Sequence, residues 1–159
     1  MIVWRLAPRR HATSLDGAGN RDQGARWNSG RGRGVVYASL NVATCVLETF
    51  VHFGPTLRAK LPENLVLVEI QVPDDAGVLR VEPAEIPADA DVRDVGRRTW
   101  YQRTGDAWLE RAEALVLLAP SIVVPREWNA MLNPAHPRMA DVAIGASEPF
   151  RLDPRLAKR

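Results

Sequence analysis

One stretch of the chain, residues 24–48, constrains the fold most because a turn, a strand and a helix must follow one another within 25 residues. Its sequence is GARWNSGRGRGVVYASLNVATCVLE. Glycines alternating over 30–34 predict a tight turn, and the β-branched and aromatic run over 35–39 predicts a strand. Asn41 is a suitable N-cap for a helix that begins at Val42. The chain therefore has to reverse and then pass directly from strand to helix.

The helix predicted after Asn41 carries one apolar stripe and turns a carboxylate away from it. The stripe consists of apolar residues at helical spacing, namely Val42, Val46, Phe50 and Phe53. At 100° per residue these residues fall within roughly 80° of one another, and Glu48 lies on the opposite side. We therefore expect Glu48 to face solvent or a cleft. Gly54 and Pro55 are expected to close the helix.

The remaining apolar runs are short and few of them have helical spacing. They predict strands at residues 2–6, 24–27, 65–72, 78–81, 115–118, 122–124 and 128–132. A second helix is predicted over 99–112, with Trp100, Trp108 and Leu109 facing the core and Gly105 weakening it. Loops are expected at 9–23 and 82–96, turns at 73–77 and 133–137, and a frayed tail over 153–159.

Short strands with few helices and without regular βαβ alternation indicate an α+β fold. At 159 residues the chain is long enough for one domain with a real hydrophobic core. We therefore expect a single domain over 1–159, with its core over about 4–150 and a central β-sheet flanked by helices.

Other bulk features bear on location and partners. No run of about 18 apolar residues exists that would span a membrane, and the N-terminal segment lacks the apolar core of a secretory signal. Cys45 is the only cysteine, so no disulfide can form within the chain. These features predict a cytoplasmic protein that does not enter a membrane.

Charge is distributed unevenly along the chain. Residues 1–35 hold seven arginines against two aspartates, whereas residues 63–94 hold nine acids against two arginines. The basic segment could meet phosphates, or both segments could simply be solvated faces. A nucleic-acid role for Arg31 and Arg33 has little support, because Trp27 and Tyr37 are the only nearby aromatics that could stack on bases.

The glycine pattern does not have the context of a nucleotide-binding motif. A dinucleotide fingerprint follows a strand and opens a helix, whereas this turn leads into a strand. Gly30, Gly32 and Gly34 are also not followed by the Lys-Ser/Thr pair of a phosphate loop. A turn that uses positive backbone φ is the simpler interpretation.

Four residues have a chemical and an ordinary interpretation, and the local sequence leaves both open. Arg26 could grip a pyrophosphate bidentately or form a structural salt bridge. Tyr37 could stack on a flat heterocycle or belong to the core. Glu48 could serve a cleft or be a solvated charge, and Ser121 could orient a ligand or cap a turn. No His/Cys cluster has metal-ligand spacing, so we expect no metal site.

Taken together, GARWNSGRGRGVVYAS, the LETF that contains Glu48 and the run LAPSIVVPREWNAMLNPAHP resemble the RES-domain toxins of bacterial toxin–antitoxin systems. The arginine, glutamate and serine that give the family its name match Arg26, Glu48 and Ser121. The resemblance runs from Trp4-Arg5 to the turn at 133–137. One departure is Ala25, which stands where a second glycine is common.

The resemblance implies a fold similar to that of ADP-ribosyltransferase toxins and an activity that consumes NAD⁺. Some members of the family look like NAD⁺ glycohydrolases or phosphorylases and others like protein ADP-ribosyltransferases. It also implies a type II system with an Xre-type helix-turn-helix antitoxin as partner. A homodimer within the toxin–antitoxin complex would be compatible with this, and the toxin itself is not expected to contact nucleic acid.

The resemblance also assigns roles. Cleavage of the nicotinamide–ribose bond expels a neutral group and leaves an oxocarbenium ion, which Glu48 would stabilise. Arg26 would bind the pyrophosphate, with Arg5 as a second candidate. Tyr37 would stack on nicotinamide, and Ser121 would orient the ribose or Glu48. The leading hypothesis is NAD⁺ degradation by hydrolysis or phosphorolysis; transfer of ADP-ribose to a protein is the alternative, and a non-catalytic nucleic-acid-binding module ranks below both.

Overall fold

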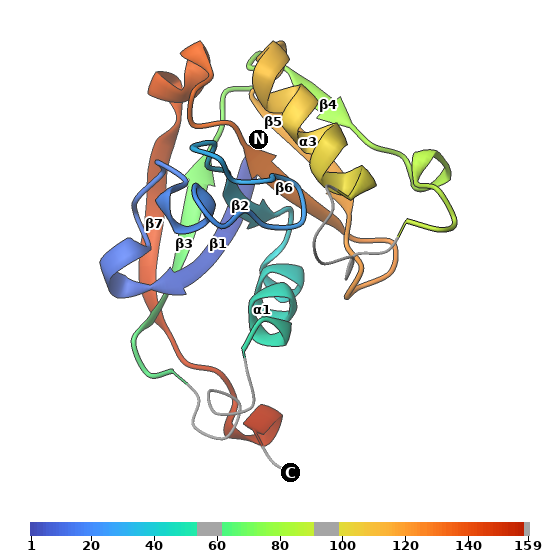
Figure 1. The fold of residues 1–159 in the computed structure, drawn as a ribbon. Coiled ribbons are helices and arrows are strands. Elements are labelled where there is room, and N and C mark those ends of the chain that lie inside the picture. Colours follow the sequence, from blue (N-terminus) through green and yellow to red (C-terminus); the bar gives the residue numbers. More distant parts are fainter. Residues whose placement is uncertain (54–61, 91–98, 158–159) are drawn as a thin grey trace.

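The computed structural model describes residues 1–53, 62–90 and 99–157. Within these residues the strands form one sheet in the order β4-β5-β6-β2-β1-β3-β7 (Figure 1). Every neighbouring pair is antiparallel except β4 and β5, which run parallel. The strands are β1 Ile2–Pro8, β2 Val36–Ser39, β3 Leu65–Gln71, β4 Val78–Arg80, β5 Val116–Pro120, β6 Trp128–Leu132 and β7 Ala143–Phe150.

Two α-helices are described, and both begin at a polar cap. Helix α1 spans Val42–Val51 and helix α3 spans Trp100–Arg111. The Asn41 side chain accepts a hydrogen bond from the Thr44 amide at 2.8 Å, and the Thr99 side chain accepts one from the Gln102 amide at 3.2 Å. Short 3₁₀ segments occupy Arg9–His11, Ala18–Asn20, Pro83–Glu85, Pro137–Asp141 and Pro154–Ala157. The predicted α+β fold with a central sheet and flanking helices is confirmed.

Residues alternate between the two faces of the sheet, and each face has its own core. One face carries a cluster with Val3, Val36, Val68, Val116 and Leu132, covered by the segments around residues 12–15 and 139–142. The opposite face carries two clusters, one under each helix. The cluster under α1 contains Leu6, Cys45, Leu65 and Leu67. The cluster under α3 contains Trp27, Trp108, Leu109, Leu117 and Met131.

The predicted stripe of α1 is confirmed, since its four apolar residues pack on the cluster beneath the helix. Helix α3 is confirmed as well, and its glycine has a structural reason. A Cβ atom at Gly105 would lie 1.8 Å from the carbonyl oxygen of Trp27, so only glycine lets the helix approach that backbone so closely. The glycine that weakens the helix locally is therefore needed for packing.

Two predicted strands are wrong. Residues 24–27 form a tight turn in which Ala25 and Asn28 make a single bridge, and Gly24 has a φ of +75°. Residues 122–124 form a turn because the Ser121 hydroxyl accepts hydrogen bonds from the amides of Val123 and Val124, which withdraws both amides from any ladder.

The C-terminal part was also predicted incompletely. Strand β7 was missed, because Gly145 and Pro149 interrupt an exposed run that lacks the composition of a strand. Most of the predicted frayed tail forms a 3₁₀ segment, and Leu152 just before it is buried. The predicted end of the first helix at Gly54 and Pro55, the stretch 91–96 of the second loop and residues 158–159 of the tail lie outside the described residues.

Candidate active site

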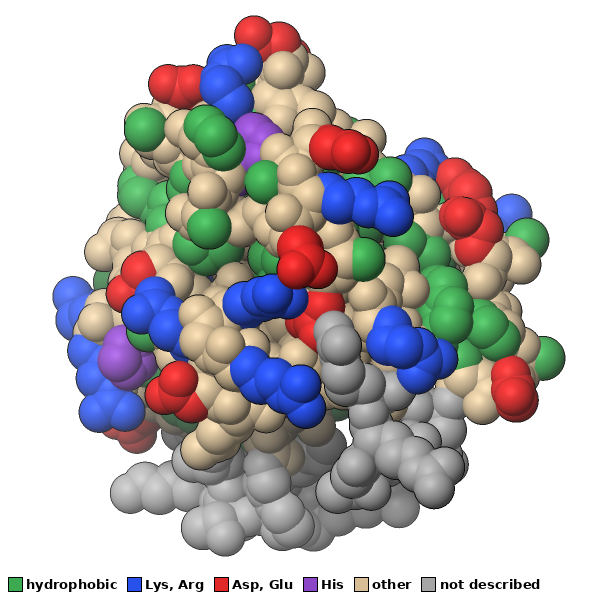
Figure 2. Space-filling model, turned by 45° about the horizontal axis from the view of Figure 1, so that its top comes forward, with side chains coloured by type: hydrophobic (Ala, Val, Ile, Leu, Met, Phe, Trp, Pro, Cys, Tyr) green, Lys and Arg blue, Asp and Glu red, His purple; other side chains and the backbone are tan. Residues whose placement is uncertain are grey.

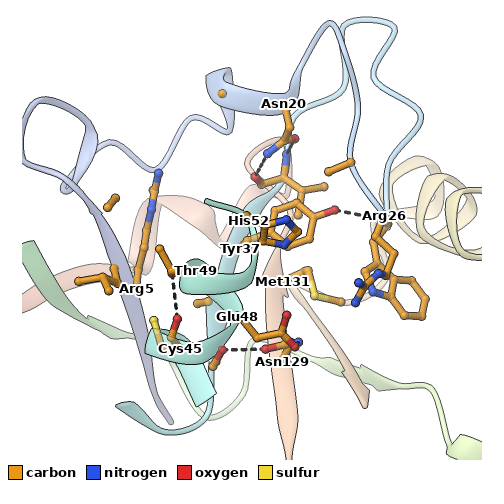
Figure 3. Close-up of a pocket in the computed structure, with 18 of the residues that line it drawn as sticks. Arg5, Asn20, Arg26, Tyr37, Cys45, Glu48, Thr49, His52, Asn129 and Met131 are labelled. Carbon is orange, nitrogen blue, oxygen red and sulfur yellow. Dashed lines mark hydrogen bonds between the residues drawn. The ribbon is translucent and has the colours of Figure 1, made fainter. Parts of the chain in front are cut away.

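Strands β1 and β2 pair at one position only, Trp4 opposite Ser39, and then part. A cavity of about 420 Å³ opens where they separate, with α1 and β6 on its other sides and the 17–27 segment above it. Figure 3 shows the polar side chains that line it. Its volume lies in the range of sites for small organic ligands. The loss of pairing between two neighbouring strands therefore creates the space for a ligand.

Glu48 reaches this cavity from the face of α1 opposite the apolar stripe, as its helical position predicts. Its Oε1 atom accepts two hydrogen bonds, from Ser121 Oγ at 2.7 Å and from Asn129 Nδ2 at 2.5 Å. The donors come from the end of β5 and from β6, more than 70 residues along the chain from the carboxylate. The fold thus places a half-buried carboxylate, held by two neutral donors, at the side of the cavity. Figure 3 shows Glu48 beside Asn129.

Ser121 combines its two predicted interpretations. Its hydroxyl oxygen accepts from the amides of Val123 and Val124 at 3.2 and 2.9 Å, which makes it the residue that closes the turn. Its hydrogen is donated to Glu48 at 2.7 Å. The residue is buried and its hydroxyl donates to the carboxylate, so Ser121 both closes the turn and contacts Glu48.

Arg26 lines the same cavity from the tight turn that replaces the predicted strand. The Tyr37 hydroxyl accepts a hydrogen bond from the amide of Trp27 at 2.9 Å and donates one to Asn28 Oδ1 at 3.1 Å. Burial raises the pKa of Tyr37 well above its usual value, so this phenol stays protonated. The Tyr37 ring lines the cavity while its hydroxyl fastens the backbone that carries Arg26.

Asn28, a residue without an assigned role at the level of sequence, organises this turn. It is fully buried, and its amide nitrogen donates to Asn20 O, Asn20 Oδ1 and Arg33 O at 3.0, 3.0 and 2.9 Å. The Asn20 Oδ1 atom also accepts from the amide of Val35 at 2.8 Å. The turn next to Arg26 is therefore rigid, although it contains several glycines.

The backbone of this turn is held by hydrogen bonds, but the Arg26 guanidinium makes no hydrogen bond or ion pair with any described residue. Its side chain is half-buried and lines the cavity. A cation at the edge of a cavity without a protein partner is available to an anionic ligand.

Arg5 lines the cavity from β1 but already has a partner. Its guanidinium donates to the backbone carbonyl of Ser14, which holds the segment after β1 in place. Burial lowers the pKa of Arg5, and the nearby charge of Asp16 opposes that shift. Arg5 is thus a less accessible cation than Arg26.

The remaining titratable groups complete the description. Burial raises the pKa of the Cys45 thiol to about 12, so the thiol is protonated at neutral pH and is not a nucleophile. His52 lines the cavity, whereas His136 Nδ1 accepts from the amide of Arg138 and shapes a distant turn. Within residues 1–53, 62–90 and 99–157 no three His, Cys, Asp or Glu side chains are grouped as metal ligands, and no helix is long and apolar enough to cross a membrane.

The sequence prediction brought Arg26, Tyr37, Glu48 and Ser121 to one site, and the structure places all four at or directly beside the cavity, together with Arg5. Asn129 was missed. The available signal was its position in the run WNAML, where strand alternation puts it on the same face as Met131 and hence toward the helices.

The fold and the cavity define an α+β domain in which two charged residues line a ligand-sized space: a carboxylate held by two donors, and an arginine without a hydrogen-bond or ion-pair partner among the described residues. Its fold is similar to that in the crystal structure of the M. tuberculosis MbcT-MbcA toxin-antitoxin complex, with a TM-score of 0.68 at 19% identity, covering 98% of this chain and 86% of that chain. The RES domain family model matches residues 2–153. The chain belongs to the RES domain family, which confirms the predicted resemblance.

Named relatives cover almost the whole chain. The Prs ADP-ribosylating toxin of Sphingobium sp. (strain YBL2) is 35% identical, covering 98% of this chain and 96% of that protein. Proteins named Toxin Res from Yersinia enterocolitica and Pseudomonas putida are 31% and 30% identical, each covering 98% of this chain and 99% of the relative. Over almost its whole length the chain is therefore similar to proteins that are named as toxins.

Proposed function

We propose that this protein is a toxin that cleaves the nicotinamide–ribose bond of NAD⁺. The observation that carries the proposal is the Glu48 carboxylate, held by Ser121 and Asn129 at 2.7 and 2.5 Å beside a cavity that also contains Arg26. The name of the 35% identical relative, an ADP-ribosylating toxin, supports an NAD⁺-linked reaction.

Cleavage of the nicotinamide–ribose bond needs a fixed negative charge, and Glu48 supplies one in this cavity. When the bond between C1′ and the nicotinamide nitrogen breaks, the electron pair leaves with nicotinamide and positive charge develops on the ribose. A fixed carboxylate next to C1′ stabilises that charge, and because the leaving group departs neutral no acid has to protonate it. Glu48 takes this role, and Ser121 keeps its carboxylate in place.

The rest of the substrate is assigned to the other cavity residues. Arg26 binds the pyrophosphate with two parallel hydrogen bonds, which the planar guanidinium allows. The Tyr37 ring stacks on the nicotinamide. Arg5, which is committed to Ser14, adds positive potential rather than a direct grip. Together these contacts align C1′ with Glu48.

Hydrolysis, phosphorolysis and transfer share this bond cleavage and differ only in what attacks C1′ afterwards. Water yields ADP-ribose, phosphate yields ADP-ribose 1″-phosphate, and a protein nucleophile yields an ADP-ribosylated protein. The second candidate function, modification of a protein, is favoured by the name of the Sphingobium relative. Labelled NAD⁺ tests it: label retained on a macromolecule supports transfer, and label found entirely in small products rejects it.

Nicotinamide release tests the central proposal. Purified protein is incubated with NAD⁺ with and without phosphate, and nicotinamide and the ADP-ribose product are quantified. We expect release by the parent and a loss of at least about 100-fold in Glu48→Gln, because the variant keeps the shape of the side chain and removes its charge. Glu110→Gln, which changes an exposed glutamate on α3, is the matched control and should retain full activity. Equal rates for Glu48→Gln and the parent would refute the mechanism.

The toxin role predicts a partner. We propose an Xre-type helix-turn-helix antitoxin, with assembly of the pair in the cytoplasm; a homodimer of the toxin within the complex is part of this proposal. Induced expression should stop growth, Glu48→Gln should relieve the arrest, and co-expression of a small helix-turn-helix protein from the adjacent gene should restore growth and co-purify. Growth arrest that persists in Glu48→Gln would separate toxicity from NAD⁺ cleavage.

A non-catalytic nucleic-acid-binding module has little support. Figure 2 shows Lys and Arg side chains interspersed with Asp and Glu on the face drawn there, which is not the continuous basic surface that a phosphate backbone favours. Salt-sensitive RNA or DNA binding that Arg31 and Arg33 substitutions weaken would revive this function.

A further inference from the structure

The two oxygens of the Glu48 carboxylate have different surroundings. Oε1 accepts both hydrogen bonds, from Ser121 Oγ at 2.7 Å and Asn129 Nδ2 at 2.5 Å. Oε2 makes no hydrogen bond with any described residue. The protein therefore occupies one carboxylate oxygen and leaves the other available to a ligand.

The direction of the hydrogen bond to Asn129 follows from chemistry alone. An ionised carboxylate can only accept, so the Asn129 amide must turn its NH₂ group toward Glu48. Its Oδ1 then faces Ser39 Oγ at 2.7 Å, and the Ser39 hydroxyl must donate. Ser39 is 2% exposed, so it has little access to solvent and the amide has no reason to flip.

The sheet sets the position of this chain of hydrogen bonds. Ser39 on β2 and Asn129 on β6 are directly opposite one another in the register of the two strands. On the other side, Ser121 is oriented by the two amides of its own turn, which leaves its hydrogen for Glu48. Both donors are thus fixed by further partners, and the carboxylate cannot rotate without breaking one of them.

We propose that Asn129, oriented by Ser39, is a positioning residue that holds Glu48 through Oε1 and so presents Oε2 to the ribose of the substrate. This inference rests on the proposed NAD⁺ cleavage. It assigns the reacting contact to one oxygen: Oε2 lies against the developing positive charge or the neighbouring ribose hydroxyl, while Oε1 serves the protein. Misplacement of a reacting group by about 1 Å can cost about 100-fold in rate, so the support of Asn129 is catalytically significant.

Two substitutions at this position separate positioning from general damage. Asn129→Leu has a similar size and no donor, and we expect kcat to fall about 10- to 100-fold at every pH, with the KM for NAD⁺ changed less than about threefold. Asn129→Asp introduces a second carboxyl group. At pH about 5 the pair shares a proton, so the new group still donates to Oε1; as the pH rises the proton is lost and two like charges meet.

The pH dependence is therefore the decisive readout. At pH about 5 we expect the kcat of Asn129→Asp to lie within about fivefold of that of the parent. At pH 8 the ratio of variant kcat to parent kcat should be at least about tenfold lower than at pH about 5. A ratio of variant to parent that stays constant across this range would overturn the positioning role. Ser39→Ala, which frees the amide to flip, should lower kcat about two- to fivefold. Thermal unfolding of each variant verifies that the domain is folded, and a variant that is unfolded is replaced in the comparison by Ser39→Ala.

A measurement made without substrate distinguishes failure of this inference from failure of the proposed function. In ¹⁵N NMR of the parent without substrate, one Asn129 NH₂ proton should resonate downfield and exchange slowly, and Glu48→Ala should abolish both properties. If the resonance behaves in this way but the parent releases no nicotinamide, the proposed function fails while the hold on Glu48 stands. If Glu48→Ala leaves the resonance unchanged, Asn129 does not hold Glu48 and the inference is wrong whatever the activity.

Discussion

The cavity contains two charged residues, Glu48 and Arg26, that the protein holds in opposite ways. The Glu48 carboxylate has two protein donors before any ligand arrives. The backbone around Arg26 is fixed by Tyr37 and Asn28, but the Arg26 guanidinium has no hydrogen-bond or ion-pair partner among the described residues. The protein thus holds the Glu48 carboxylate itself, through Oε1, whereas for Arg26 it fixes only the backbone from which the side chain extends.

Under the proposed cleavage of NAD⁺, the difference follows from the role of each charge. Charge at the reacting carbon exists only in the transition state, so the group that stabilises it must be in place beforehand. A pyrophosphate is charged throughout and can itself order the arginine that binds it, because a bidentate contact offsets the loss of side-chain freedom. We therefore expect changes at Glu48 and its donors to appear in kcat and changes at Arg26 to appear in KM.

Substitution of Arg26 is the strongest test of this comparison. Arg26→Ala should lower kcat/KM about 100-fold, nearly all of it through KM, because an anchor for the ground state and the transition state alike is lost. Arg26→Lys keeps the charge but not the bidentate geometry, and we expect a KM increase of about tenfold. Initial rates over a range of NAD⁺ concentrations give both parameters, and inhibition by ADP, which retains the pyrophosphate, should weaken in parallel. A fall in kcat at unchanged KM would place Arg26 at the reacting centre and would invalidate the comparison.

Tyr37→Phe should have a smaller effect and tests how Arg26 is held. The ring remains, but the amide of Trp27 and Asn28 Oδ1 lose their partner, so we expect about 1–3 kcal/mol of lost stability and a KM increase of about three- to tenfold. Urea unfolding and NAD⁺ kinetics measure the two effects.

Tyr37→Leu is the companion variant, because it removes the ring as well as the hydroxyl. Any additional loss of NAD⁺ affinity beyond Tyr37→Phe measures the stacking on nicotinamide. If Tyr37→Phe has the KM of the parent and only Tyr37→Leu is impaired, the hydroxyl does not control Arg26.

The parts of this site that the sequence predicted are those that depend on local periodicity or on the family motif. The direction of Glu48 followed from the 3.6-residue repeat of its own helix, and the frame of α1 followed from Asn41 and the apolar stripe. Arg26 and Ser121 were identified by resemblance, and the structure then brought Ser121 into direct contact with Glu48.

The parts that could not be predicted depend on partners far away in the chain. The contact between Asn129 and Glu48 spans 81 residues and exists only because β6 pairs with β2 in one register. The Tyr37 hydroxyl reaches a turn whose backbone was predicted as extended, and nothing local indicated that the turn would close through Asn28. Strand β7 lies at the edge of the sheet, where exposure removes the apolar alternation that identifies a strand.

Cys45 gives the smallest expected effect and tests whether hydrogen bonds alone hold the Glu48 carboxylate. Cys45 is a buried residue of α1 and lines the cavity, so we expect Cys45→Ala to keep NAD⁺ cleavage at pH 7 within about twofold, since neither donor to Glu48 is changed. A loss of tenfold or more would mean that packing by Cys45, and not only Ser121 and Asn129, determines where Glu48 lies.

The stability of the same variant should depend on pH in a defined direction. Burial raises the pKa of the Cys45 thiol from 9.0 to about 12, so the folded state holds this proton more tightly than the unfolded state. The resulting stabilisation is complete below pH 9.0 and is lost as the pH rises toward 12. Chemical denaturation should therefore give a constant difference between parent and Cys45→Ala from about pH 6 to 8, and by about pH 10.5 the difference should shift in favour of the variant by about 1–2 kcal/mol. A difference that stays constant up to that pH would show that the thiol reaches solvent, and the cavity around Glu48 would then be less closed than its hydrogen bonds imply.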